Sequence, residues 1–136
     1  MTDVLCDTSI VLKWFHEDGE DGVPPARALL DAHRDGALTA WILELTFYEL
    51  GNVLLRSLGW RSADAADQLD DLRAICPVLA PAPDAPRLAA ELADTHSLTF
   101  YDALYAAAAE LHGAALATAD EALLESGLGV PPGTLV

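Results

Sequence analysis

The sequence predicts an α/β protein in which helices cover both faces of a parallel sheet. Apolar runs too short for helices alternate with longer segments whose apolar residues recur at helical spacing. The chain has 136 residues, 52% of them hydrophobic, so it can bury a sizeable core. No repeat, linker or low-complexity stretch divides it, and we expect one domain over residues 1–136.

In the first half of the chain, proline, glycine and hydroxyl residues mark the boundaries of the predicted elements. Prolines at the start and Gly36 at the end bound one helix, while Ser62 caps another that stops before Pro77. The predicted order is a strand at residues 4–6, a D-T-S turn with a helix after it, a helix at 24–36, a strand at 37–40, a helix from Ile42 to about Ser57, and a helix at 62–75.

The second half repeats the alternation. Leu88 and Leu92 follow helical spacing, and Thr99 and Gly113 suit the two ends of an alanine-rich helix. The predicted order is a short strand within residues 77–83, helices at 84–97 and 99–113, a strand at 114–120, a short helix at 121–126, and a turn-rich tail at 129–136 with room for a last edge strand.

Composition narrows the class of protein. No apolar run approaches the roughly 18 residues that a membrane span needs, and no basic region precedes the first apolar stretch, so we expect a soluble, cytoplasmic protein with no membrane contact. Cys6 and Cys76 form neither a disulfide framework nor a zinc pattern. The net charge of −15 repels nucleic acid and argues against a simple nucleic-acid-binding module. The chain has one lysine, six arginines and abundant alanine, and a GC-rich coding bias and adaptation to high salt both remain open as the origin of this composition.

Two acids follow predicted strands directly. Asp7 comes after the apolar run at residues 4–6, and Asp120 ends the strand at 114–120. Ligands of open parallel sheets bind outside the carboxyl ends of the strands, where the direction of winding reverses. Each acid is also well placed to cap the helix that follows it, so both interpretations stay open.

Two further acids lie on predicted helices. Glu49 has Leu45 and Val53 one turn away on either side and no cation within reach, so Glu49 and Asn52 form a polar pair on a mostly apolar stripe. If buried, the pair needs a cation or further donors. Asp102 lies in the first turn of the alanine-rich helix, where taken alone it suits the acid of a capping box. The three other acids in comparably apolar surroundings favour a carboxylate site instead.

Four carboxylates at one sheet edge repel one another unless a cation lies among them. Oxygen ligands select hard ions, so we expect Mg²⁺, with Mn²⁺ as a substitute. The histidines lie on four separate segments, and no GxSxG elbow or phosphate-binding P-loop occurs. A phosphoacceptor receiver domain would also hold magnesium, but it needs a lysine near its last strand, and Lys13 lies near the start.

Taken in order, the stretches "LCDTSIVLKW", "TFYELGNVLLR", "LTFYDALYAAAAELHG" and "LATADEALL" resemble the PIN-domain ribonucleases, most closely the VapC-type toxins of toxin–antitoxin pairs. The resemblance spans nearly the whole chain. It assigns the family's acidic residues and its supporting polar residues to positions of this sequence. The acids are Asp7, Glu49, Asp102 and Asp120, and the supporting residues are Thr8, Ser9, Asn52 and Thr118.

The resemblance implies a PIN-like three-layer fold with four to five parallel strands. It also implies a magnesium-dependent endoribonuclease whose four acids are catalytic and hold the metal, with RNA as substrate, a cognate antitoxin that blocks the site, and a homodimer. A non-catalytic PIN-like interaction module is the alternative function. Scattered arginines are the candidates for gripping RNA, and aromatic side chains line either a groove for an antitoxin helix or the core. The arginines are Arg27, Arg34, Arg56 and Arg61, and the aromatics are Trp14, Phe15, Phe47 and Tyr48.

Overall fold

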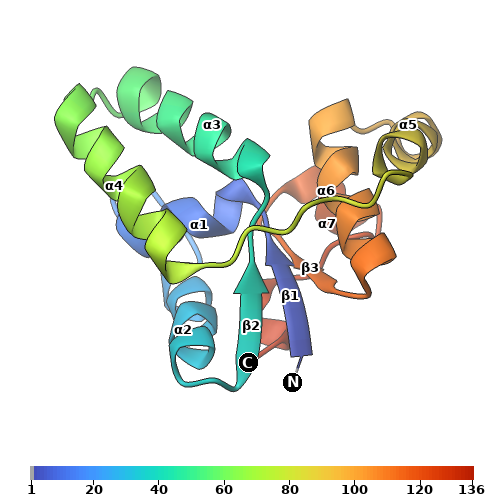
Figure 1. The fold of residues 1–136 in the computed structure, drawn as a ribbon, viewed down its shortest axis with the longest axis horizontal. Helices are drawn as coiled ribbons and strands as arrows, with labels where there is room; N and C mark the ends of the chain where they lie inside the picture. Colours follow the sequence, from blue (N-terminus) through green and yellow to red (C-terminus); the bar gives the residue numbers. More distant parts are fainter. Residues whose placement is uncertain (1) are drawn as a thin grey trace.

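The structure is a computed structural model that describes residues 2–136. Helices dominate it, and three strands lie between them (Figure 1). In chain order the elements are β1 (Thr2–Cys6), α1 (Thr8–Phe15), α2 (Val23–Arg34), β2 (Leu38–Trp41), α3 (Glu44–Asn52), a π-helical turn (Val53–Ser57), α4 (Ser62–Ile75), α5 (Ala85–His96), α6 (Phe100–His112), β3 (Ala115–Ala117), α7 (Glu121–Glu125) and a 3₁₀ turn (Pro132–Thr134).

The strands form one parallel sheet in the order β2-β1-β3. Val4 pairs with Ala40 on one side of β1 and with Ala115 on the other, so β1 is the central strand. The chain winds from β1 to β2 in one direction and reaches β3 on the opposite side. The reversal of winding therefore lies at the carboxyl end of β1, which is where the sequence predicts a ligand site.

The described residues contain three strands rather than the predicted four or five. The segments at 77–83 and 129–136 each contribute only a single parallel bridge, Ile42 with Val78 and Ala117 with Val130. Prolines flank both bridges, and proline has no N–H to donate to a ladder, so neither segment extends into a strand. The parallel α/β class is confirmed, with fewer strands.

Alternating side chains of β1 face two separate helical layers. Val4 and Cys6 belong to a buried cluster shared with α1, α2, α3 and α4, whereas Leu5 belongs to a cluster shared with α6 and α7. Figure 1 shows these two groups of helices on opposite sides of the strands. The three-layer architecture thus follows from the period-two geometry of a strand whose side chains are apolar on both faces.

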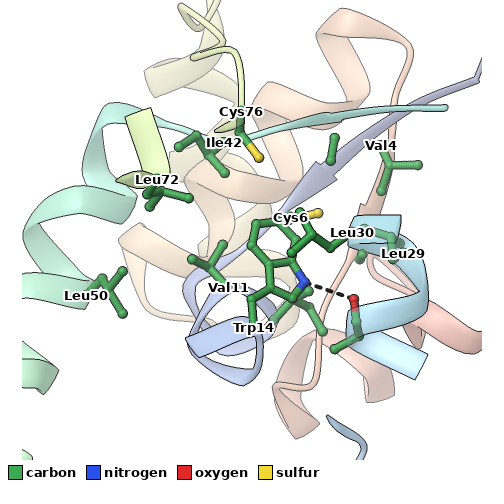
Figure 2. Packing of buried hydrophobic residues seen from close by; sticks show 14 of the residues in the cluster. Val4, Cys6, Val11, Trp14, Leu29, Leu30, Ile42, Leu50, Leu72 and Cys76 are labelled. Atoms are coloured by element: carbon green, nitrogen blue, oxygen red, sulfur yellow. Dashed lines mark hydrogen bonds between the residues drawn. The ribbon is translucent and has the colours of Figure 1, made fainter. Parts of the chain in front are cut away.

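Trp14 organises the first layer. Its indole N–H donates to the carbonyl oxygen of Ala26 at 2.8 Å, which ties α1 to α2 (Figure 2). Trp14 and Phe47 are 6% and 5% exposed, so the hypothesis of an aromatic antitoxin groove is wrong for these two and the core alternative holds. Phe15 is half-buried, and only Tyr48 of the four is exposed.

The alanines of α6 are buried on both sides of the helix. Ala103 and Ala107 pack against Ala89 of α5, while Ala106 and Ala109 join the cluster that contains Leu5. Small side chains let α5 approach α6 closely on one side while the sheet covers the other. Asp102 and Tyr105 are thus polar side chains on a helix whose buried residues are otherwise alanines.

Two boundaries differ from the prediction. Ile42 lies in a bridge rather than a helix, so α3 begins at Glu44, and the helix continues past Asn52 as a π-helical turn. Ser62 is the first residue of α4 and Arg61 occupies the cap position. Within residues 2–136, no helix has both the length and the apolar character needed to cross a membrane.

Candidate active site

Asp7 lies at the carboxyl end of β1, where its carboxylate is held by hydroxyl groups from two segments. Ser9 Oγ donates to Oδ1 and Thr118 Oγ1 donates to Oδ2, both at 2.5 Å. The amide of Ile10 donates to Oδ1 at 3.3 Å, so Asp7 also caps α1 as the alternative interpretation predicts. Capping and a site role are therefore compatible, because the two oxygens have several acceptor positions.

The electrostatic state of Asp7 is unusual for an aspartate. Burial raises its pKa from 3.8 to about 6, the hydroxyls of Ser9 and Thr118 lower it in part, and the charge of Asp102 raises it. Its side chain is buried and has no cationic partner among the described contacts that set this pKa. A carboxylate in this condition is poised either to keep a proton or to accept a cation.

Thr118 connects Asp7 to Asp120. Its Oγ1, which donates to Asp7, accepts a hydrogen bond from the amide of Asp120 at 2.9 Å. Asp120 in turn accepts from the amide of Leu123 at 3.0 Å and caps α7. The amide of Ala119 donates to Ser9 Oγ at 2.9 Å. The loop after β3 is thus fastened to the start of α1 through the two hydroxyls that hold Asp7.

Glu49 meets further donors rather than a cation. Thr8 Oγ1 and the hydroxyl of Tyr105 each donate to its Oε1 at 2.7 Å. The Tyr105 oxygen also lies 2.8 Å from Oγ1 of the buried Thr46. These contacts join α3 to α1 and α6, and they confirm the expectation that a partly buried Glu49 needs additional hydrogen bonds.

Asp102 lies in the first turn of α6, where Thr99 caps the helix by accepting from its amide at 3.1 Å. Burial raises the pKa of the Asp102 carboxyl, and the negative charges of Asp120 and Glu49 raise it further. Asp102 is thus the acid through which the electrostatic interactions among the four carboxylates run, since its charge also raises the pKa of Asp7. Thr99 caps α6, and the negative charges of Asp120 and Glu49 still repel the carboxylate of Asp102.

Among residues 2–136, Asn52 and the candidate arginines form no hydrogen bond or ion pair with the four acids of the site. Asn52 is exposed and lines a pocket with Glu49. Arg27 lies 3.7 Å from Glu17, and Arg34 lies 4.0 Å from Asp31. Arg56 and Arg61 are exposed on the π-helical turn and before α4.

Sequence reasoning missed Tyr105 and Thr46. Tyr105 is 1% exposed, and burial together with the charge of Glu49 raises the pKa of its hydroxyl, so the group stays protonated and donates. Tyr105 lies three residues after Asp102 and Thr46 three residues before Glu49, one helical turn away in each case. A hydroxyl within an otherwise apolar stripe, one turn from an acid, was the available signal.

The donor set suits a hard divalent cation. Hydroxyl groups contact the carboxylate of Asp7, whose pKa is raised in part by the charge of Asp102. The pKa of Asp102 is raised in part by the charges of Asp120 and Glu49, and a bound cation would relieve this repulsion. Among residues 2–136, however, no three acidic, histidine or cysteine side chains are gathered closely enough to form a ready metal cage. The chemistry of the donors fits Mg²⁺ or Mn²⁺, and the side chains would have to move to bring three of the acids to one ion.

Comparisons with known proteins agree with this architecture. A family model described as the PIN domain matches residues 4–126. PAE2754 from Pyrobaculum aerophilum is similar in structure, with 30% identity, a TM-score of 0.72, and coverage of 98% of this chain and 93% of that chain. No curated protein matches the sequence.

Two solved complexes share the fold at lower identity. A toxin–antitoxin complex from Klebsiella pneumoniae has 20% identity, a TM-score of 0.70, and coverage of 95% of this chain and 97% of that one. VapBC2 from Rickettsia felis, bound to a DNA fragment from its promoter, has 17% identity, a TM-score of 0.67, and coverage of 91% and 92%.

The first prediction concerns Gly129, whose position leaves no room for a side chain. A Cβ there would lie 2.5 Å from Cγ2 of Thr118, which cannot rotate without losing Asp7. We expect Gly129→Ala to destabilise the protein by about 1–3 kcal/mol in thermal unfolding. Adding Thr118→Ser, which removes Cγ2 and keeps the hydroxyl, should restore much of this loss.

Gly133→Ala is the matched control for Gly129→Ala, because its Cβ would meet Pro25 at an ordinary 3.7 Å. Equal melting temperatures for the two alanine variants would contradict the predicted clash.

The second prediction concerns the pH dependence of stability in EDTA. Because the pKa of Asp7 is about 6 in the folded protein and 3.8 ordinarily, the folded state keeps a proton that the unfolded state releases. Protonated Asp7 therefore contributes fully to the free energy of unfolding below pH 3.8, and this contribution is lost as the pH rises through about 6. Relative to Asp7→Asn, the wild type should lose about 3 kcal/mol between roughly pH 4 and 7.

Chemical denaturation at a series of pH values measures this difference, with the exposed Asp94→Asn as the control that keeps the wild-type slope. Parallel curves for wild type and Asp7→Asn would show that Asp7 has an ordinary pKa.

The third prediction separates the two interpretations of Asp102. As a capping acid it stabilises the helix, and Asp102→Asn should then melt lower. As one of a repelling group, its replacement should raise the melting temperature in EDTA by a few degrees and remove the stabilisation that Mg²⁺ gives the wild type. We expect the second result because Asp120 and Glu49 act on this carboxyl.

Asp64 is the matched control for Asp102, since it is an exposed acid at the same position in the first turn of α4. Asp64→Asn should melt slightly lower. If both variants melt lower and the magnesium response survives, Asp102 does not belong to the site.

Proposed function

Because the chain belongs to the PIN-domain family, we propose that it is a divalent-metal-dependent endoribonuclease and the toxin of a toxin–antitoxin pair. One observation carries the proposal. Electrostatic interactions link carboxylates from four separate segments near the carboxyl end of β1: the charge of Asp102 raises the pKa of Asp7, and the charges of Asp120 and Glu49 raise that of Asp102. The same four acids are the ones that the family resemblance assigns.

Asp7 and Asp102 would be the principal ligands of Mg²⁺ or Mn²⁺, with Asp120 and Glu49 completing the site. The ion, when bound, supplies polarisation of a phosphate oxygen and a lower pKa for water. Ser9 and Thr118 hold both oxygens of Asp7, so that carboxylate does not have to be ordered when the ion arrives.

Glu49 is oriented by Thr8 and Tyr105, and a carboxylate not engaged with the ion can orient the attacking water and accept its proton. The water oxygen forms a bond to phosphorus while the bond from phosphorus to the 3′ oxygen breaks, and the departing 3′ oxygen takes up a proton from solvent. The products are a 5′-phosphate and a 3′-hydroxyl.

The partner follows from charge and from the structural relatives. The similar structure from Klebsiella pneumoniae is a toxin–antitoxin complex. An acidic site on a chain of net charge −15 would accept an arginine or lysine from such a partner. We propose a small antitoxin with basic residues, a homodimer as the assembly, and the cytoplasm, where RNA is plentiful, as the place of action.

The fourth prediction tests the activity. Purified protein should cleave single-stranded RNA in Mg²⁺ or Mn²⁺ and stop in EDTA, because no histidine pair replaces the ion. Asp7→Asn should lose about 100-fold or more in rate while keeping its circular dichroism spectrum, and Asp94→Asn should stay active. The ends of the cut RNA should be 5′-phosphates.

Unchanged cleavage in EDTA would remove the metal mechanism. If the wild type is inactive but binds a basic partner through this site, the alternative of a non-catalytic interaction module takes its place.

A further inference from the structure

A pocket of about 270 Å³ adjoins the site at Glu49. It is lined by Leu45, Tyr48, Glu49, Asn52 and Tyr101. We propose that it is a subsite in which an unpaired nucleobase of the substrate stacks between tyrosine rings. The proposal rests on the nuclease function above and specifies what the enzyme recognises: a single strand whose bases are free to leave the stack.

Two exposed aromatic rings from separate helices meet at this pocket. Tyr48 of α3 is 65% exposed and Tyr101 of α6 is 59% exposed. An isolated exposed apolar residue is ordinary, but rings from positions 53 residues apart that line one pocket next to an acid of the site are not accounted for by packing. The volume is below the range of about 300–1,000 Å³ typical of whole small ligands, which suits one base rather than a complete nucleotide.

At this pocket, stacking would supply affinity for RNA without help from a positively charged side chain of the lining. The pocket lining includes no lysine or arginine. Lys13 is buried beside Glu20 at 2.9 Å, and Arg73 is engaged with Glu44 at 2.9 Å. A chain of net charge −15 cannot gain much from counterion release, whereas the stacking of bases on aromatic rings requires no positive charge.

Tyr48 is held in position before any ligand arrives. Its hydroxyl donates to Oε1 of Glu44 at 3.2 Å, and both oxygens of Glu44 accept from Arg73. The Arg73 guanidinium also lies 4.0 Å from the centre of the Phe47 ring. These contacts restrain the ring of Tyr48, which reduces the entropy lost when a base stacks on it.

Polar groups of the pocket can read the edge of the base. The Asn52 amide offers both a donor and an acceptor, the complement of a nucleobase edge. Glu49 belongs to the pocket and to the catalytic group, so the stacked base would neighbour the phosphate that is cut. Asn52 is thus a specificity residue rather than a metal ligand in this proposal.

The test measures the binding of single-stranded RNA hexanucleotides that carry 2-aminopurine, whose fluorescence falls when the base stacks. All variants are made in the Asp7→Asn background in Mg²⁺, so that the probe is not cut. Tyr48→Ala and Tyr101→Ala should each raise Kd about tenfold, the equivalent of about 1.4 kcal/mol of lost stacking, and should restore fluorescence. Tyr48→Phe keeps the ring and should retain the quenching.

Leu111→Ala is the matched control, because Leu111 is an exposed apolar residue at the other end of α6 and does not line the pocket. A ribose–phosphate hexamer without bases should bind the tyrosine variants and the parent equally. Unchanged Kd and fluorescence in both alanine variants would overturn the proposal, as would equal losses for the probe without bases.

If the alanine variants lose affinity for a co-expressed antitoxin and keep their affinity for RNA, the pocket is a protein-docking surface and the proposal is wrong. The nuclease function is judged separately by cleavage with wild-type protein. A wild type that cleaves RNA, with tyrosine variants that bind it normally, refutes only the stacking subsite.

Discussion

The buried carboxylate of Asp7 is the constraint on which the rest of the site depends. A charge at the end of a central strand is costly to bury, and this one is tolerated because Ser9, Thr118 and a helix N-terminus all donate to it. Those donors come from the segments after β1 and β3, so satisfying one carboxylate also fixes how the two strands leave the sheet. The same hydrogen bonds therefore stabilise both the local fold and the geometry of the candidate active site.

Tyr105 connects helices through its hydroxyl, as Thr118 connects the loops after β1 and β3. Its hydroxyl reaches Glu49 of α3 and lies 3.1 Å from Oγ1 of Thr8 in α1, while its backbone belongs to the helix that carries Asp102. Glu49 and Asp102 are consequently connected through Tyr105, which donates to the first and lies on the same helix as the second. A shift of α6 would move Asp102 and reorient Glu49 together, which keeps the relative positions of the carboxylates insensitive to small motions of either helix.

Much of the fold was predictable because local signals and burial agreed. The apolar run at residues 4–6, the helix stops at Gly36 and Gly113, and the cap at Thr99 each depend on neighbouring residues alone. The electrostatic coupling of Asp7 and Asp102 also followed from their positions at strand and helix ends. The position of Tyr105 one turn from Asp102 marked it as unusual, but its partners lie 56 and 59 residues away, so its contacts could not be predicted from neighbouring residues. The aromatics could not be divided between core and surface for the same reason. Phe47 and Tyr48 are adjacent in the chain, and which of them is covered depends on how α3 packs against α1 and α4.

The single bridges at both margins of the sheet bear on how the protein associates. An edge strand normally displays a row of unpaired amides and carbonyls that can recruit a strand from another molecule. Here Val78 and Val130 each occupy one position of that row, and Pro77 and Pro131 beside them have no amide hydrogen to offer. Extension of the sheet from either margin is thereby discouraged, which guards a chain that is 52% hydrophobic against fibrous aggregation.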